Sequence, residues 1–436
     1  MTSPLFTMDA ILAATGGRAE GVTAAQINSI SIDSRELGPD ALFVAIKGDR
    51  FDGHDFVATA LENGAVAALV SRGGGPGTIM VADALQGLRD LAIAARQRSR
   101  ASIVGVTGSV GKTTTKEMIR TMFAAAGQTH ASIKSFNNHW GVPLMLARMQ
   151  QSAQFGVFEL GMNHAGEIEP LGRLVRPHIA VITTIAPAHL EAFGSLEGIA
   201  AAKAEIFTGL EPGGVAVLNA DHAQIGVLRE HAMAAGVATV VTYGFAEGSD
   251  WEITSYETAA DKSFAAIRHA GETYQLVLNV PGRHMVVDAV AALAVGFIAG
   301  VEPAVALRAL AGFGAQPGRG QKLSFGAADK PLVLTDESYN ANTASMIAAL
   351  EVFASQKAQG RKVLVLGDML ELGPQGPELH ASLAEAVVAS EAEAVYLVGP
   401  QMAALAEVLG PGGVTAHTST AAEMGEIVVR DLAYGD

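Results

Sequence analysis

The chemistry that this sequence could perform is concentrated first in a glycine-rich stretch, Thr107 to Thr113 (T-G-S-V-G-K-T). A β-branched run precedes it, and a helix is predicted to follow, through about Phe123. Gly108 and Gly111 let backbone N–H groups approach an anion closely, and the helix N-terminus adds its dipole. Lys112 supplies a positive charge for the β- and γ-phosphates of a nucleotide, and the threonine hydroxyl after it can bind Mg²⁺. The stretch therefore predicts a phosphate-binding loop.

One residue departs from the usual phosphate-loop pattern, and one alternative to a phosphate loop must be weighed. Val106 stands where the general G-x-x-x-x-G-K-[ST] pattern has glycine. The alternative, a tight turn before an ordinary helix, would not require lysine and then threonine after the second glycine. Nucleotide binding remains the stronger hypothesis, with contacts expected from Thr107, Gly108, Ser109, Val110, Gly111, Lys112, Thr113 and Thr114.

Further polar residues lie where predicted strands end. Glu159 ends the strand at 155–160, His189 follows the strand at 179–185, and Lys203 lies on the helix predicted after it, 196–210. Ligands of doubly wound sheets gather at the carboxyl ends of the strands, and Mg²⁺ prefers oxygen donors. A buried structural role for Glu159 is disfavoured, because an unpaired buried carboxylate is costly. By position alone, His189 could equally be a hydrogen-bonded loop histidine, and Lys203 a solvated helix residue.

The elements that must position these residues indicate an α/β protein of three domains. Residues 1–98 mix short strands and helices. Residues 99–313 alternate apolar strands with helices, which predicts a doubly wound, mostly parallel sheet, with an antiparallel extension over 243–278. Residues 314–436, which include the hinge signal Pro317-Gly318-Arg319-Gly320 near their start, form a Rossmann-like unit with a helix predicted over 377–389. A sheet of this kind usually adds another strand after the helix at 421–432, so we expect its last strand to be missing.

Composition narrows the function classes. The chain has 436 residues, a formal net charge of −15 and no cysteine. This charge argues against a nucleic-acid or anionic-membrane partner, and the lack of cysteine excludes disulfides, thiol nucleophiles and cysteine zinc sites. The N-terminus has no basic region followed by a long apolar run, and no stable membrane insertion is expected. A cytoplasmic enzyme is the default prediction.

Several motifs carry a resemblance to a known family. They are the loop with Lys116-Glu117 behind it, and the segments at 137–143 (N-N-H-W-G-V-P), 159–163 (E-L-G-M-N), 188–195 (A-H-L-E-A-F-G-S) and 202–207 (A-K-A-E-I-F). Essentially end to end, the chain resembles the Mur ligases, the ATP-dependent amide-forming enzymes of peptidoglycan precursor synthesis. The phosphate loop of that family reads T-G-[ST]-x-G-K-[ST], which Thr107 to Thr113 fits, so Val106 no longer counts against it.

Two segments are similar to motifs of the family member that adds D-alanyl-D-alanine. Asp336 to Asn342 (D-E-S-Y-N-A-N) resembles D-D-x-Y-N-A-N-P, and Gly367 to Gly373 (G-D-M-L-E-L-G) resembles G-D-M-x-E-L-G. The D-N-P-R signature of the member that adds diaminopimelate or lysine is absent. Met285 and Asp288 stand where the family usually has asparagine.

The resemblance implies roles for individual residues. Lys112, His189 and Lys203 are the implied catalytic residues, with Lys203 carbamylated by CO₂. Two Mg²⁺ ions are implied, held by Thr113, Glu159, His189 and Lys203. ATP is implied to contact, beyond the loop, Asn279, His284, the hinge residue Arg319 and Asp336. The substrate is implied to contact Ser34, Arg35, Lys47, Asp52, His54, Asn137, Asn138, Tyr339, Asn340 and Asn342. Arg35 and Lys47 are chemically suited to a diphosphate.

The implied activity is ligation of D-alanyl-D-alanine to UDP-N-acetylmuramoyl-tripeptide by a monomeric enzyme, through an acyl phosphate. A first alternative is a related ligase that adds a single amino acid to the UDP-muramoyl-dipeptide or glutamate to folate. A second is a P-loop NTPase that acts as a switch or motor and hydrolyses ATP without an amine acceptor. A third, a non-catalytic nucleotide-binding protein, is disfavoured by the number of placed polar residues.

Overall fold

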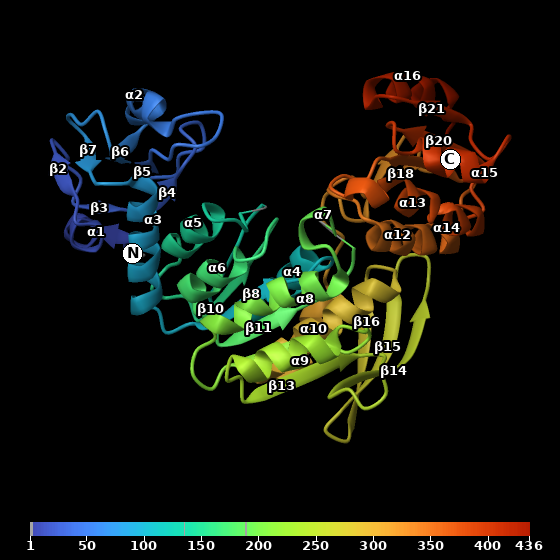
Figure 1. Cartoon of the computed structure of the whole chain (residues 1–436), viewed down its shortest axis with the longest axis horizontal. Helices are drawn as coiled ribbons and strands as arrows, with labels where there is room; N and C mark the ends of the chain where they lie inside the picture. Colours follow the sequence, from blue (N-terminus) through green and yellow to red (C-terminus); the bar gives the residue numbers. More distant parts are fainter. Residues whose placement is uncertain (1–2, 135, 188–189) are drawn as a thin grey trace.

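A computed structural model describes residues 3–134, 136–187 and 190–436 of the chain. Three bodies follow one another in chain order, the N-terminal and C-terminal ones flanking a central body that carries the largest sheet (Figure 1). Within the described residues, no helix is both long and apolar enough to cross a membrane. The predicted α/β architecture is confirmed, whereas the domain boundaries near residues 98 and 313 stay a prediction.

The N-terminal body is built on a small mixed sheet. Its strand order is β2 (Arg18–Glu20), β7 (Thr78–Met80), β6 (Ala65–Val70), β5 (Ala41–Val44), β4 (Ser29–Ser31). A two-stranded sheet pairs β1 (Phe6–Thr7) with β3 (Gln26–Ile27). The helices are α1 (Met8–Thr15), the 3₁₀ turn η1 (Gly53–Phe56), α2 (Val57–Glu62) and α3 (Ala84–Arg98). Helix α3 joins this body to the next: buried Arg96 donates from its guanidinium to the backbone oxygens of Val175 (2.8 Å) and Arg176 (2.7 Å).

The central sheet is mostly parallel, as predicted. Its order in the described chain is β16 (Glu272–Leu278), β15 (Ser263–His269), β14 (Trp251–Thr258), β13 (Thr239–Gly244), β12 (Val215–Asn219), β11 (Ile179–Ile182), β8 (Ser102–Thr107), β10 (Phe155–Glu159), β9 (Thr129–Ala131). Only the β14–β15 and β15–β16 pairs are antiparallel, which confirms the predicted extension. The strand order reverses beside β8, because β10 and β11 lie on its two sides, and such a switch point is where ligands bind.

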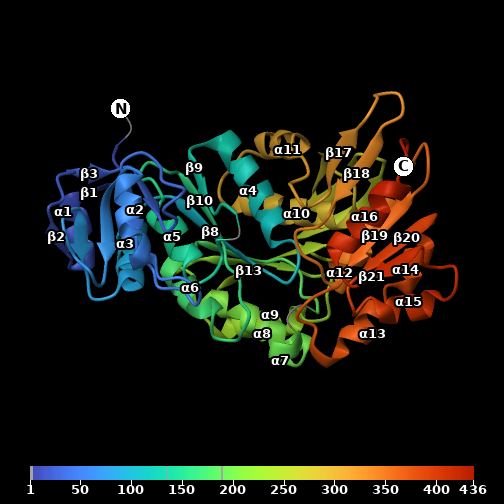
Figure 2. The same cartoon turned by 90° about the horizontal axis from the view of Figure 1, so that it is seen from above.

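Two helical layers cover this sheet (Figure 2). One contains α4 (Lys112–Ala126), α10 (Arg283–Ile298) and α11 (Pro303–Ala311). The other contains α5 (Gly141–Ala147), α6 (Ile168–Val175), α7 (Leu190–Phe193), α8 (Leu196–Ala204) with the 3₁₀ turn η2 (Glu205–Gly209), and α9 (Ile225–Ala234). Strand β8 serves both cores, since Ile103 packs on one face and Val104 and Val106 on the other. Helix α10 is buried from Met285 to Gly296, as expected for a helix that is apolar nearly all round.

The C-terminal body contains two sheets. An antiparallel pair consists of β17 (Gln321–Phe325) and β18 (Leu332–Asp336), and a parallel sheet of β19 (Val363–Gly367), β20 (Ala394–Val398) and β21 (Ala416–Thr418). Its helices are α12 (Thr343–Ser355), the 3₁₀ turn η3 (Gly373–Gln375), α13 (Gly376–Ala381), α14 (Ala384–Ala389), α15 (Ala403–Leu409) and α16 (Ala421–Asp431). The predicted single helix over 377–389 is wrong, because α13 packs on α15 whereas α14 also packs on α12. Residues 435 and 436 lie between the sheets, accepting hydrogen bonds from the backbone N–H groups of Gly360 (2.7 Å) and Val333 (3.0 Å).

Candidate active site

The phosphate loop joins β8 to α4, and the neighbouring strand β11 fixes its path. The hydroxyl of Thr183, just after β11, donates to the backbone oxygen of Val110 (2.6 Å), and the N–H of Ser109 donates to the oxygen of Thr184 (2.7 Å). Gly108 has a φ of +151°, and a Cβ added there would lie 1.8 Å from the Thr183 hydroxyl oxygen. Only glycine fits this close approach of loop and strand.

The loop presents groups suited to a polyphosphate. The Lys112 ammonium folds over it and donates to the backbone oxygens of Gly108 (2.7 Å) and Ser109 (3.3 Å). Removal from bulk water lowers the pKa of Lys112, although the Glu159 carboxylate opposes this change. The side-chain hydroxyls of Thr107 and Ser109 are buried without a hydrogen-bond partner in the described part of the chain. Buried polar groups of this kind are normally satisfied, so they fit a site that receives a ligand.

Glu159, at the end of β10, is brought directly against this loop. Its Oε2 accepts a hydrogen bond from the Thr113 hydroxyl (2.9 Å), and its Oε1 accepts one from the Asn137 side-chain amide (2.9 Å). The carboxylate is nearly fully buried. A carboxylate and a hydroxyl at this separation are the hard oxygen donors that Mg²⁺ prefers, so Thr113 and Glu159 fit the predicted metal site.

Arg319 brings the C-terminal body into the same site. Its Nη2 donates to the Thr113 hydroxyl oxygen over 3.1 Å, although the two residues are 206 positions apart in sequence. Its guanidinium carbon lies 4.2 Å from the ring centre of Tyr339. Three predicted residues, Thr113, Glu159 and Arg319, therefore converge from two bodies of the chain.

Lys203 is buried on α8, close enough to Lys112 for the charge of that ammonium to affect it. Burial lowers its pKa well below the usual value, and the Lys112 charge lowers it further. In this environment a lysine loses its proton more easily than in water, so the neutral amine is favoured. His189, the other residue predicted beside it, lies outside the described residues.

Asp288 is a site residue whose importance the sequence did not reveal. Its buried carboxylate lies under the loop, since a Cβ added to Gly111 would lie 2.5 Å from its Oδ1. Burial raises the pKa of Asp288 to about 7, while Thr115 and Arg319 oppose the rise. Thr183 was also missed, although a pair of threonines directly after an apolar strand could have signalled it.

Two other residues predicted to contact the nucleotide, Asn279 and Asp336, form hydrogen bonds within the protein. The Asn279 side-chain amide donates to the Ala311 oxygen (2.7 Å), and desolvation lowers the pKa of His284 to about 4. Asp336 accepts hydrogen bonds from the Ser338 hydroxyl (2.6 Å) and the Gly318 N–H (3.1 Å), and those from Ser338 lower the pKa of Asp336 most.

Most of the predicted substrate residues of the N-terminal body bond to other residues of that body. Arg35 forms a bidentate pair with Asp33, whose pKa the Arg35 hydrogen bond lowers to about 2. His54 bonds to Asp52 through Nδ1 (2.6 Å) and accepts the Ser71 N–H at Nε2 (2.9 Å), so it is a satisfied structural histidine. Lys47 is exposed, and Ser34 is buried with its backbone oxygen accepting from the side chain of Asn63.

The loop that carries Asn137 links the N-terminal body to Glu159. The Lys134 ammonium pairs with Glu36 (2.6 Å), and the Trp140 ring packs on Gly48. Two of the predicted asparagines bond to backbone groups at the start of helices. Asn138 Oδ1 accepts the N–H of Gly141 (2.9 Å), the first residue of α5, and Asn342 begins α12 with a capping box. Asn340 accepts the Ala341 N–H at its own Oδ1.

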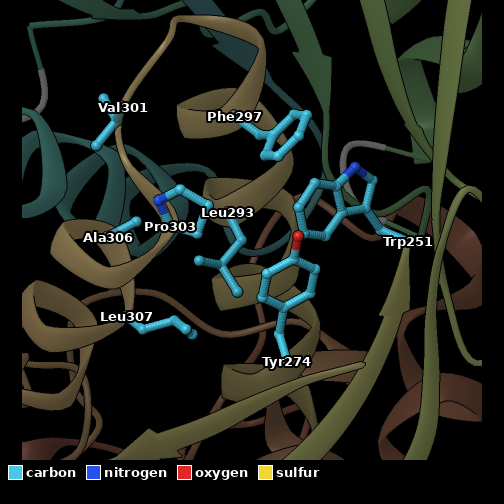
Figure 3. A pocket seen from close by; sticks show the side chains of 8 residues that line it. All are labelled: Trp251, Tyr274, Leu293, Phe297, Val301, Pro303, Ala306 and Leu307. Atoms are coloured by element: carbon cyan, nitrogen blue, oxygen red, sulfur yellow. The ribbon is translucent and has the colours of Figure 1, made fainter. Parts of the chain in front are cut away.

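A separate small cavity lies at the edge of the central body formed by β14, β16, α10 and α11 (Figure 3). Its lining is aromatic and aliphatic, from Trp251, Tyr274, Leu293, Phe297, Val301, Pro303, Ala306 and Leu307. Ligand sites need a few convergent polar groups as well. The cavity is therefore packing space and not a second active site.

Comparison with known proteins agrees with this geometry. Three family models match the chain: the Mur ligase family catalytic domain at residues 26–103, the Mur ligase middle domain at 106–296, and the Mur ligase glutamate ligase domain at 319–436. The UDP-N-acetylmuramoyl-tripeptide–D-alanyl-D-alanine ligase of Escherichia coli is 37% identical over 88% of this chain and 84% of its own length. The chain belongs to the Mur ligase family.

Other Mur ligases give the same result. The enzyme of that name from Bacillus subtilis is 35% identical over 87% of this chain and 82% of its own. Among solved structures, MurF from Acinetobacter baumannii superposes with a TM-score of 0.85 and 31% identity, covering 98% of this chain and 92% of that one. MurF from Thermotoga maritima, solved in complex with ADP, gives a TM-score of 0.77 at 25% identity, covering 94% and 92%. The resemblance inferred from the motifs is confirmed.

Asp288→Asn should reveal the cost of the buried carboxylate in this Mur ligase. Because burial raises the pKa of Asp288 from 3.8 to about 7, the contribution of this group to stability falls as the pH rises between those values. At pH 8 the variant should therefore unfold with a free energy higher by about 1–4 kcal/mol, and near pH 4 the difference should vanish. Urea denaturation at both pH values measures this, with exposed Asp261→Asn as the control. Equal stability of the parent and Asp288→Asn at pH 8 would contradict the assignment.

Proposed function

We propose that this chain joins D-alanyl-D-alanine to UDP-N-acetylmuramoyl-tripeptide and converts ATP to ADP and phosphate. The observation that carries the proposal is the convergence of Thr113, Glu159 and Arg319 from two bodies of the chain. A ligase must shield a hydrolysable acyl phosphate from water, and a site shared between hinged bodies suits this need. The names of the relatives and the two motifs at 336–342 and 367–373 support the choice of acceptor.

Phosphoryl transfer asks the protein mainly for positioning and for neutralisation of charge. We assign the β- and γ-phosphates to the loop amides and the Lys112 ammonium. Thr113 and Glu159 would hold Mg²⁺, which neutralises phosphate charge when it is bound. Phosphorylation converts the tripeptide carboxylate into an acyl phosphate, because an unactivated carboxylate has a poor leaving group. The amine of the dipeptide then attacks the carbonyl carbon and phosphate leaves.

Lys203 is proposed to act as a carbamate. CO₂ reacts with a neutral amine and releases a proton, and the burial that lowers the pKa of Lys203 favours the neutral amine. The product exchanges a cation for oxygen donors, which with His189 would suit a second Mg²⁺. The negative charge of the carbamate would also attract the Lys112 ammonium.

The remaining residues are assigned to the two ends of the substrates. The N-terminal body, with Ser34, Arg35 and Lys47, would hold the UDP end of the substrate, and Asp336 the ATP ribose. Asn279 and His284 would lie near the base. We propose domain boundaries after residues 98 and 313, and action in the cytoplasm, where ATP and UDP-linked precursors are available.

Phosphate release tests the proposed function directly. With UDP-N-acetylmuramoyl-tripeptide, ATP and Mg²⁺ present, adding D-alanyl-D-alanine should start phosphate release, whereas single amino acids should not. Turnover that is equal without the dipeptide would indicate an NTPase, and turnover with one amino acid would indicate a related ligase. Either result would reject the proposal.

Replacement of Lys203 tests the carbamate. Lys203→Ala should lose at least about 100-fold in ligation rate, because a metal-binding group is removed. High bicarbonate together with a short-chain carboxylic acid should restore part of it, since the acid replaces the missing oxygens. Exposed Lys357→Ala is the control and should behave like the parent protein. Failure of rescue at any acid concentration, in a variant with an unchanged melting temperature, would contradict this role.

A further inference from the structure

Arg319 is held in place by an interlocked pair of segments in the C-terminal body. The turn at 316–320 is tied to the end of β18, because the Gly320 N–H donates to the Asp336 backbone oxygen (2.9 Å) and the Gly318 N–H to its Oδ2 (3.1 Å). The bond in the other direction runs from the Tyr339 N–H to the Gly318 oxygen (3.2 Å). The backbone on both sides of Arg319 therefore has a fixed path.

Tyr339 packs on the same turn. Gly318 has a φ of +70°, and a Cβ added there would lie 2.9 Å from Tyr339 Cβ, so the turn and the tyrosine are in close contact. The ring extends under the guanidinium of Arg319, whose central carbon lies 4.2 Å from the ring centre. A guanidinium stacks favourably on an aromatic face at this distance, and the face limits where its planar fork can point.

The other end of the Arg319 side chain reaches the phosphate loop. Its Nη2 donates to the Thr113 hydroxyl (3.1 Å), which itself donates to Glu159. Arg319 thus spans from the Tyr339 ring in one body to the proposed metal ligands in another. A long, flexible side chain loses rotamer entropy when it is ordered in this way, and the ring reduces that loss by restricting it beforehand.

We infer that Tyr339 is a positioning residue, whose ring aims Arg319 at the phosphate loop, and not a contact to the UDP-linked or dipeptide substrate. The inference deepens the proposed function and rests on it for the identity of the reaction, but not for nucleotide binding. It replaces the role that the sequence resemblance implied for Tyr339. A residue that acts through Arg319 must affect the nucleotide, because Arg319 faces Thr113.

Nucleotide affinity with and without the ring tests the inference. Tyr339→Leu should weaken Mg²⁺-ADP binding, measured by calorimetry, roughly three- to thirtyfold, the range for loss of a cation–π contact. Tyr339→Phe keeps the ring and should bind Mg²⁺-ADP within about twofold of the parent protein. Tyr434→Leu replaces another exposed tyrosine of the same body and is the matched control, expected to leave ADP affinity unchanged.

A double variant separates positioning from direct contact. In an Arg319→Ala background, Tyr339→Leu should cause no further loss of ADP affinity, because the side chain it acts through is gone. In ligation assays, Tyr339→Leu should raise KM for ATP and lower kcat, and leave KM for the other two substrates unchanged. A full additional loss in the Arg319→Ala background, or unchanged ADP affinity with a raised KM for the dipeptide or the tripeptide, would overturn the inference. Because ADP binding needs no acceptor, failure of the ligase assignment would leave this test readable.

Discussion

The hydroxyl of Thr113 is the point on which the site depends. It donates to Glu159 and accepts from Arg319, so one oxygen atom connects the phosphate loop, the end of β10 and the C-terminal body. Each partner is fixed by something else: Glu159 also by Asn137, Arg319 by the ring of Tyr339, and the loop by Thr183. The fold serves to bring these three supports to one hydroxyl.

Charge explains why such a site suits a nucleotide. Lys112 and Arg319 place positive charge at the phosphate loop, and the pKa of Lys112 is lowered by burial and also by the nearby charge of Arg319. Glu159 and Asp288 supply negative charge in the same region. Buried ions are costly unless they are paired, so an excess of cations favours the arrival of a polyphosphate. Carbamylation of the neutral Lys203 amine would add negative charge at the position where the metal ions are proposed to bind.

Much of this could be predicted from the sequence, for identifiable reasons. The apolar runs predicted as strands over 155–160 and 179–185 are strands at Phe155–Glu159 and Ile179–Ile182, because buried parallel strands read as continuous hydrophobic stretches. The phosphate loop and Glu159 follow from glycine spacing and from the rule that strand ends gather ligands. That Arg319 reaches the nucleotide site was implied only by the family resemblance. Its hydrogen bond to Thr113 depends on how two bodies are placed, which local patterns do not show. The division of 377–389 into two helices and the burial of Asp288 under Gly111 also depend on tertiary packing, which local patterns do not encode.

The central claim is that Thr113 and Glu159 form the metal site of the nucleotide. Calorimetric titration of ADP with and without Mg²⁺, in the parent protein and in Glu159→Gln, tests it most directly. Glutamine keeps the size and one oxygen but removes the charge that attracts the ion. We expect Mg²⁺ to strengthen ADP binding in the parent protein. In Glu159→Gln this strengthening should be at least about tenfold smaller, while the ADP affinity without Mg²⁺ should equal or exceed that of the parent protein. An undiminished Mg²⁺ effect in Glu159→Gln would contradict the account.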